Sequence, residues 1–85
     1  MSQQIDVSPT IFQFRKFRFF FFSREEPRMH VHVYTPEGEA KYWLEPRIEL
    51  AVNCGIRQQE LKTIEKKIKE KADEFKQAWK DHFKS

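Results

Sequence analysis

The chain contains Pro27-Arg28-Met29-His30-Val31-His32-Val33, followed closely by Glu39-Ala40-Lys41-Tyr42-Trp43-Leu44-Glu45-Pro46. In both stretches apolar and polar side chains alternate, and β-branched or aromatic residues are frequent, which is typical of β-strands. Between them, Thr35-Pro36-Glu37-Gly38 has the composition of a tight turn. These three segments predict a β-hairpin.

Two further strands are predicted ahead of this hairpin. Ile11–Phe14 forms the first and Phe17–Ser23 the second, with Arg15-Lys16 as the bend. Arg-Lys is an unusual choice there, because two-residue hairpin turns require positive φ and favour Asn or Gly. Residues 19–22 are four consecutive Phe, which predicts a strand covered on both faces or one whose outer face meets a partner. Residues 1–8 are mostly polar and lack periodicity, so they are predicted to form a flexible N-terminal arm.

After the fourth predicted strand, the spacing of apolar residues becomes helical. Pro46 suits the first turn of a short helix, because its fixed φ matches that position. Ile48, Ala51 and Val52 would share one face of this helix. Gly55 would end it in the left-handed conformation that glycine tolerates.

A long C-terminal helix is predicted over residues 57–84. Arg57 occupies its N-cap position and Glu60 the N3 position, and Ile56 can pack against Leu61. Its apolar stripe, in steps of three, four and one of seven, consists of Leu61, Ile64, Ile68, Phe75, Trp79 and Phe83. The predicted fold is therefore α+β. A small antiparallel sheet of about four strands, a short helix and a long helix packed across the sheet form a single domain over residues 9–85.

Composition places the chain among small globular proteins. Its 85 residues suffice for one domain, and 15% aromatic residues enlarge the core. Residues 47–85 carry the whole net charge of +3, with ten Lys/Arg against seven Asp/Glu. This surplus is small for a dedicated nucleic-acid binder, and a solvated helix face accounts for it. The single cysteine excludes an internal disulfide, and no apolar run approaches the roughly 20 residues of a membrane span, so we expect a cytoplasmic protein without membrane contact.

His30 and His32 project from one face of their predicted strand, because side chains alternate along a strand. In one interpretation both imidazoles form local hydrogen bonds that stabilise the sheet. In another they act with Arg18 and Arg28 as catalytic residues on a phosphodiester, since two imidazoles beside a cation can activate a hydroxyl and stabilise the charged intermediate. The residue types alone leave both interpretations open.

A zinc site is the third interpretation of the two histidines. It requires further ligands, which His82 or Cys54 would have to supply from elsewhere in the fold. No spacing in the chain marks a structural metal site, so neither a metal nor a cofactor is predicted.

Lys41, Trp43 and Tyr34 are candidates for contact with nucleic acid or a partner protein. Aromatic rings on an open sheet face can stack on bases, and Lys41 shares a face with Trp43 while Tyr42 lies on the other. The alternative is that cations in strands merely keep an exposed face soluble.

Several segments of the chain, in their order, resemble one small bacterial family. They are Pro9-Thr10-Ile11-Phe12, Phe17-Arg18-Phe19-Phe20-Phe21-Phe22-Ser23, Pro27-x-x-His30-Val31-His32-Val33, residues 39–46 and Phe75-x-x-Ala78-Trp79. The family is catalogued as domain of unknown function 4160, and the resemblance covers nearly all of residues 9–84. Two features depart from it: Lys16 stands where the bend usually carries a glycine, and the N-terminal arm precedes the point where such proteins often begin.

The resemblance implies a function at the level of a gene pair. Members of the family are commonly encoded beside a protein of family 2442, in an arrangement that resembles a toxin–antitoxin module. It implies that this chain is the toxin-like component, with a cognate small protein encoded nearby. From the residues we add the hypothesis that it acts on RNA through the His30/His32 face, as a metal-independent ribonuclease if it is an enzyme. The alternative is a non-enzymatic protein-binding module, an antitoxin or regulator, that works in a complex or as a homodimer.

Overall fold

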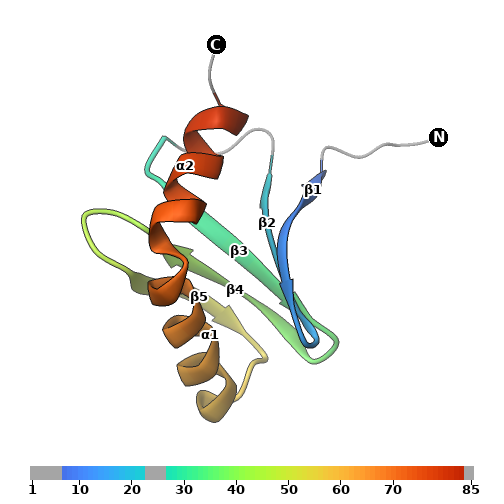
Figure 1. Cartoon of the computed structure of the whole chain (residues 1–85). Coiled ribbons are helices and arrows are strands. Elements are labelled where there is room, and N and C mark those ends of the chain that lie inside the picture. The colour runs from blue at the N-terminus through green and yellow to red at the C-terminus, as the bar shows by residue number, and fades with distance from the viewer. Residues whose placement is uncertain (1–6, 23–26, 84–85) are drawn as a thin grey trace, which may run out of the picture.

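The computed structural model describes residues 7–22 and 27–83, with side chains from residue 10 onward, as five strands followed by two helices (Figure 1). The elements are β1 (Val7–Phe14), β2 (Phe17–Phe22), β3 (His30–Thr35), β4 (Gly38–Trp43), β5 (Glu49–Cys54), α1 (Gln58–Glu70) and α2 (Ala72–His82). The strands form one antiparallel sheet in the order of the chain, and both helices lie across one face of it (Figure 1). The predicted α+β fold class is confirmed, with five strands in place of about four.

The alternation of β2 divides its phenylalanines between the two faces of the sheet. Phe17, Phe19 and Phe21 face the helices and are buried. Phe20 and Phe22 lie on the opposite face, which no described helix or strand covers. We call this opposite face the open face. The run of phenylalanine thus supplies the core and the open face with rings at the same time.

The apolar stripe of the helices fills the space above the sheet, as predicted. Its members Leu61, Ile64, Ile68, Phe75 and Trp79 are buried, and Phe83 is partly buried against them. The hydroxyl of Tyr42 on β4 donates a hydrogen bond of 3.1 Å to the carbonyl of Leu61 on α1, and burial raises the pKa of this phenol to about 12. One polar contact therefore fixes α1 on the sheet within an otherwise apolar layer.

The two predicted hairpins are present. Phe14 pairs with Phe17, so Arg15-Lys16 is the bend between β1 and β2, and Arg15 adopts a left-handed φ of 56°. In the second hairpin the hydroxyl of Thr35 accepts hydrogen bonds from the backbone amides of Glu37 and Gly38. A side chain at Gly38 would collide with the carbonyl oxygen of Cys54, so this turn requires glycine.

The short helix predicted after Pro46 is wrong, because the segment Glu49–Cys54 is strand β5. A β-bulge at Ala51 explains the error: Lys41 pairs with Val52, and the next residue of β4, Tyr42, pairs with Leu50. The extra residue interrupts the two-residue alternation of the strand, and the apolar spacing then resembles that of a helix. Gly55 does adopt the predicted left-handed conformation, with a φ of 93°, but at the end of a strand.

The long helix predicted over residues 57–84 is two helices separated at Lys71. Lys71 leaves helical geometry, with φ −106° and ψ 16°, while its amide still donates to the carbonyls of Lys67 and Ile68. The break falls within the seven-residue step between Ile68 and Phe75, in which no residue is fully buried. Arg57 is the N-cap residue of α1, as predicted. Residues 1–6 of the expected arm and Ser23 lie outside the described residues, and the backbone of residues 7 and 8 belongs to β1.

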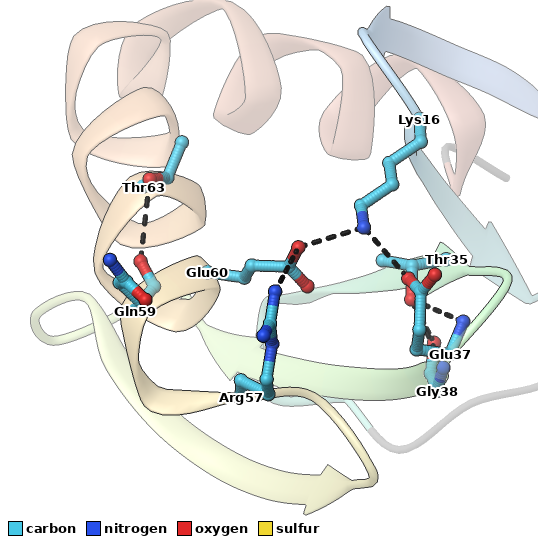
Figure 2. A network of polar contacts seen from close by, with 8 residues as sticks. All are labelled: Lys16, Thr35, Glu37, Gly38, Arg57, Gln59, Glu60 and Thr63. Atoms are coloured by element: carbon cyan, nitrogen blue, oxygen red, sulfur yellow. Dashed lines mark hydrogen bonds and ion pairs between the residues drawn. The ribbon is translucent and has the colours of Figure 1, made fainter.

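A small charge network joins both hairpin turns to the start of α1 (Figure 2). The ammonium of Lys16 lies 2.8 Å from a carboxylate oxygen of Glu37 and 2.7 Å from one of Glu60, and Arg57 lies 3.7 Å from the same Glu60 oxygen. Hydrogen bonds to the two carboxylates raise the pKa of Lys16, and the bond from Lys16 lowers the pKa of Glu37. The network thus fixes α1 relative to the turns at this end of the sheet.

We expect Trp79→Ala to lower the free energy of unfolding by about 3–5 kcal/mol, because it removes a buried indole and leaves a cavity. The ring lies against Phe21, Phe83 and His30, with centroid distances of 5.3, 4.3 and 5.0 Å. Urea denaturation followed by circular dichroism measures the change. A loss below about 1 kcal/mol would show that Trp79 does not support the core.

Lys16→Met should lower stability most between the ordinary pKa of its partner Glu37, 4.5, and the ordinary pKa of Lys16 itself, 10.5. A lowered carboxyl pKa stabilises the fold above about pH 4.5 and loses this effect as pH falls through the folded value, and a raised ammonium pKa stabilises it below about pH 10.5. The difference in melting temperature between wild type and variant should therefore be largest between these limits and shrink outside them. Lys80→Met, which changes an exposed lysine of α2, is the control. A difference for Lys16→Met that does not change with pH would contradict the ionic origin.

Candidate functional site

The open face carries cross-strand rows of mostly aromatic and cationic side chains. Phe20, His32, Lys41 and Val52 are successive partners across β2, β3, β4 and β5. A second row is formed by Arg18, Tyr34, Glu39 and Cys54. Because cross-strand partners project to the same side, each row lies on one face of the sheet. The alternate residues of β3, Val31 and Val33, face the core and are fully buried.

Three cations of this face lie over aromatic rings. The guanidinium of Arg28 lies 4.0 Å from the ring of Trp43, and the ammonium of Lys41 lies 4.6 Å from the same ring. The guanidinium of Arg18 lies 4.7 Å from the ring of Phe20. Cation–π attraction holds these long side chains flat against the sheet, so their charges are positioned before any ligand arrives.

Hydrogen bonds fix two of these cations further. The Nε of Arg28 donates to the carbonyl of Glu45 at 2.9 Å, and the Nε of Arg18 donates to the hydroxyl of Thr10 at 2.5 Å. Both bonds use the Nε of the guanidinium, so the outer edge of each fork, with its two terminal nitrogens, is directed away from the anchoring bond. A fork presented in this way matches the oxygens of a phosphate or carboxylate.

His30 is placed inside the molecule. The ladder between β2 and β3 ends at the pair Phe20–His32, and beyond it the two strands diverge (Figure 1). Trp79 of α2 contacts His30 where the strands separate, with a centroid distance of 5.0 Å, and Trp43 lies against the same imidazole at 5.7 Å. The side chain of His30 is fully buried. Its Nδ1 lies 2.6 Å from the carbonyl oxygen of Arg28, and a carbonyl only accepts, so this nitrogen carries a proton.

His32 remains partly accessible on the open face. Its ring centroid lies 5.1 Å from that of His30, 4.4 Å from that of Phe22 and 5.5 Å from that of Phe20. The two histidines are therefore neighbours, as predicted, but only His32 is exposed to a ligand. Of the two histidines predicted to act together, His32 is accessible and His30 is buried against it.

The other predicted site residues gather on the same face. Tyr34 is 45% exposed, and Lys41 and Trp43 are half-buried. A shallow hollow of about 220 Å³ lies beside them, lined by Phe22, His32, Glu39, Ala40, Lys41, Val52 and Cys54. Sequence reasoning missed Phe22 and Val52 as part of this surface. Alternation along β2 contained the signal for Phe22, whereas Val52 was assigned to a helix.

The described residues do not provide the further ligands that the zinc interpretation requires. Among residues 10–22 and 27–83, no group of three or more His, Cys, Asp or Glu side chains is arranged to hold a metal ion. His82 lies against the rings of Phe21 and Phe83 in the helix layer, and Cys54 lies at the exposed end of β5. Within the part of the chain that the structure describes, no helix is long and apolar enough to cross a membrane.

Comparison with known proteins gives one match. A family model described as "Domain of unknown function (DUF4160)" matches residues 16–80, which include β2 to β5, α1 and most of α2. No curated protein and no solved structure matches the chain significantly.

The two histidines should differ sharply in their effect on stability. His30→Ala removes a buried ring and leaves the carbonyl of Arg28 without its hydrogen bond, so we expect a loss of roughly 2–4 kcal/mol. His32→Ala changes a partly exposed ring, and we expect a loss of less than about 1 kcal/mol. Chemical denaturation of the two variants side by side measures the contrast. Equal losses would contradict the burial of His30.

Proposed function

The chain belongs to the family described as "Domain of unknown function (DUF4160)", and we propose that it binds single-stranded RNA through the open face of its sheet. In this proposal it is the toxin-like component of a two-gene module. The support for RNA is the group of rings and cations on the open face, and the support for the module is the usual gene arrangement of the family.

The observation that carries the proposal is Trp43 with its two cations. The indole is half-buried, and Arg28 and Lys41 lie within 4.0 and 4.6 Å of its ring. Single-stranded nucleic acid is bound by such combinations, because bases stack on rings while neighbouring cations contact phosphates. Tyr34 and His32 offer further ring surface on the same face.

The charge of the open face suits an RNA strand held mainly by stacking. Among the described residues, Arg18, Arg28 and Lys41 lie over rings of this face. Two carboxylates flank them, because Glu39 lies near the start of β4 and Glu49 pairs with Trp43 at its end. These three described cations can neutralise three phosphates directly. For single strands the dependence of log K on log salt would have a slope of about −2, which is shallow for a nucleic-acid binder.

Binding is favoured over cleavage by the position of His30. Metal-independent cleavage by two imidazoles requires that both reach the phosphodiester, one as base and one as acid. His30 is fully buried, whereas His32 is partly accessible beside Lys41. We therefore propose that His32 contacts the RNA and that His30 positions His32 and Trp43 from below.

A second candidate function is supported by the edge of the sheet. β5 is an edge strand with exposed Leu50 and Val52, and exposed edges pair readily with another strand. In this alternative the protein is a binding module that works with its cognate partner or as a homodimer. A protein that does not bind RNA, but forms a dimer or a complex with the neighbouring gene product by light scattering, would favour this alternative.

We expect Trp43→Ala to weaken RNA binding about tenfold or more, because base–aromatic stacking is worth roughly 1–3 kcal/mol. Lys41→Gln should weaken it less and reduce the salt slope by about 0.7, the value for one phosphate contact. Fluorescence anisotropy with a labelled 12-nucleotide RNA, measured at several salt concentrations, tests both. Lys80→Gln removes the same charge from the exposed face of α2 and serves as the matched control.

Two outcomes of this experiment would contradict the proposal. One is RNA affinity that Trp43→Ala leaves unchanged, and the other is an equal loss in Lys80→Gln. The toxin-like role is tested separately by induced expression in a bacterial host. Growth arrest by the wild type that Trp43→Ala relieves supports it, and the absence of arrest argues for the second candidate.

A further inference from the structure

A second basic site lies on the helix side of the sheet, away from the open face. It is a hollow of about 270 Å³ between the β1–β2 bend and α1, lined by Phe14, Arg15, Thr63, Lys66, Lys67 and Glu70. Phe14 faces the helix layer and packs against the core, so this hollow and the open face are separated by the sheet.

The backbone at Arg15 calls for an explanation. Arg15 has a φ of 56°, a left-handed conformation that favours Gly or Asn at hairpin turns and disfavours long side chains. Its carbonyl accepts a hydrogen bond of 3.1 Å from the side chain of Gln13, but any residue at this position would offer the same carbonyl. The two-residue turn requires the left-handed backbone but not arginine, so what arginine adds at this position is its side chain.

The side chain of Arg15 joins a concentrated group of cations. Its guanidinium lies 4.8 Å from the ring of Phe14, and the ammonium of Lys67 lies 4.3 Å from the same ring. Lys66 lines the hollow from the next position of α1. The ring of Phe14 is thus contacted by two like charges, whose mutual repulsion a bound anion would offset.

The pKa of the one carboxylate in the hollow, Glu70, reflects the positive charges around it. Glu70 lies 2.9 Å from Lys67, and this bond, together with the charges of Lys66 and Lys71, lowers the pKa of Glu70. Glu70 offsets one positive charge, whereas Arg15, Lys66 and Lys67 contribute three. The hollow therefore keeps an excess of positive charge that its own residues do not balance.

We propose that this hollow binds a phosphate group. The fork of Arg15 suits two phosphate oxygens, and Lys66 and Lys67 add point charges. The hydroxyl of Thr63 lines the same hollow; it donates to the carbonyl of Gln59 over 3.4 Å, a long bond that it can exchange for a phosphate oxygen. The group is either free phosphate or the terminal phosphate of a nucleic-acid strand, since both present the same oxygens.

Inorganic phosphate is the first probe. Full-length ¹⁵N-labelled protein is titrated with sodium phosphate at constant ionic strength, and sodium chloride is the reference anion. We expect saturable shifts of the amides of Arg15, Lys16, Thr63 and Lys67. Arg15→Asn should weaken the binding about tenfold, as expected for the loss of a charge-assisted bidentate contact. The same variant should raise the melting temperature, because asparagine tolerates the left-handed backbone better.

The opposite effects of Arg15→Asn on binding and on stability separate the two roles of the residue. Lys80→Ala, with the same loss of charge on α2, should leave phosphate binding unchanged. Shifts that do not saturate, shifts that chloride reproduces, or an Arg15→Asn variant that binds phosphate like the wild type would each overturn the proposal.

A second titration distinguishes the two sources of the phosphate. Two RNA oligonucleotides of one sequence, with a 5′-phosphate or a 5′-hydroxyl, are compared on wild type and Arg15→Asn. Tighter binding of the phosphorylated strand that Arg15→Asn abolishes identifies a terminal phosphate. Equal binding of both strands, with saturable binding of inorganic phosphate, identifies free phosphate. Trp43→Ala changes the open face and leaves the phosphate hollow intact. A failure of the phosphate proposal can therefore be distinguished from a failure of the open-face proposal.

Discussion

The structure depends on one constraint: the two described helices cover one face of a sheet that carries aromatic rings on both faces. Phe17, Phe19 and Phe21 of β2 are buried under the helices, and no described element covers Phe20 and Phe22 on the other side. α1 and α2 lie one after the other across the face that carries Phe17, Phe19 and Phe21 (Figure 1). Among the described residues, the immediate neighbours of these rings shield them: Phe20 is nearly fully buried beside Arg18, Phe22 and His32. A face built in this way is stable in water and still offers ring surface to a ligand.

His30 and Trp79 connect this face to the core. The divergence of β2 from β3 allows the indole of Trp79, from the helix layer, to contact an imidazole that belongs by alternation to the open face. His30 in turn lies against Trp43 and His32, two of the residues to which we assign contact with RNA. Packing in the core thus positions the binding surface, and removal of the ring in Trp79→Ala is expected to disturb both.

Local patterns made much of this fold predictable, and non-local contacts account for what they missed. The β3–β4 hairpin follows from alternation and from Thr35-Pro36-Glu37-Gly38, and the helical stripe follows from its spacing. β5 was mistaken for a helix because the bulge at Ala51 breaks its alternation, and a bulge is defined by the partner strand. The burial of His30 was equally hidden, since it arises from the divergence of two strands and from a side chain 49 positions away, at Trp79. The predicted site residues were brought together because their alternation was correct, whereas their depth depended on packing that no local pattern encodes.

The chain has two tryptophans, one in each layer, and they report directly on which face meets RNA. The single-tryptophan variants Trp79→Phe and Trp43→Phe, each shown to be folded by circular dichroism, are titrated with single-stranded RNA while indole fluorescence is recorded. The open-face account predicts saturable quenching of Trp43 in the Trp79→Phe variant and no change in the fluorescence of Trp79 in the Trp43→Phe variant. Quenching of Trp79 with an unchanged signal from Trp43 would contradict it, because RNA would then bind on the helix side of the sheet.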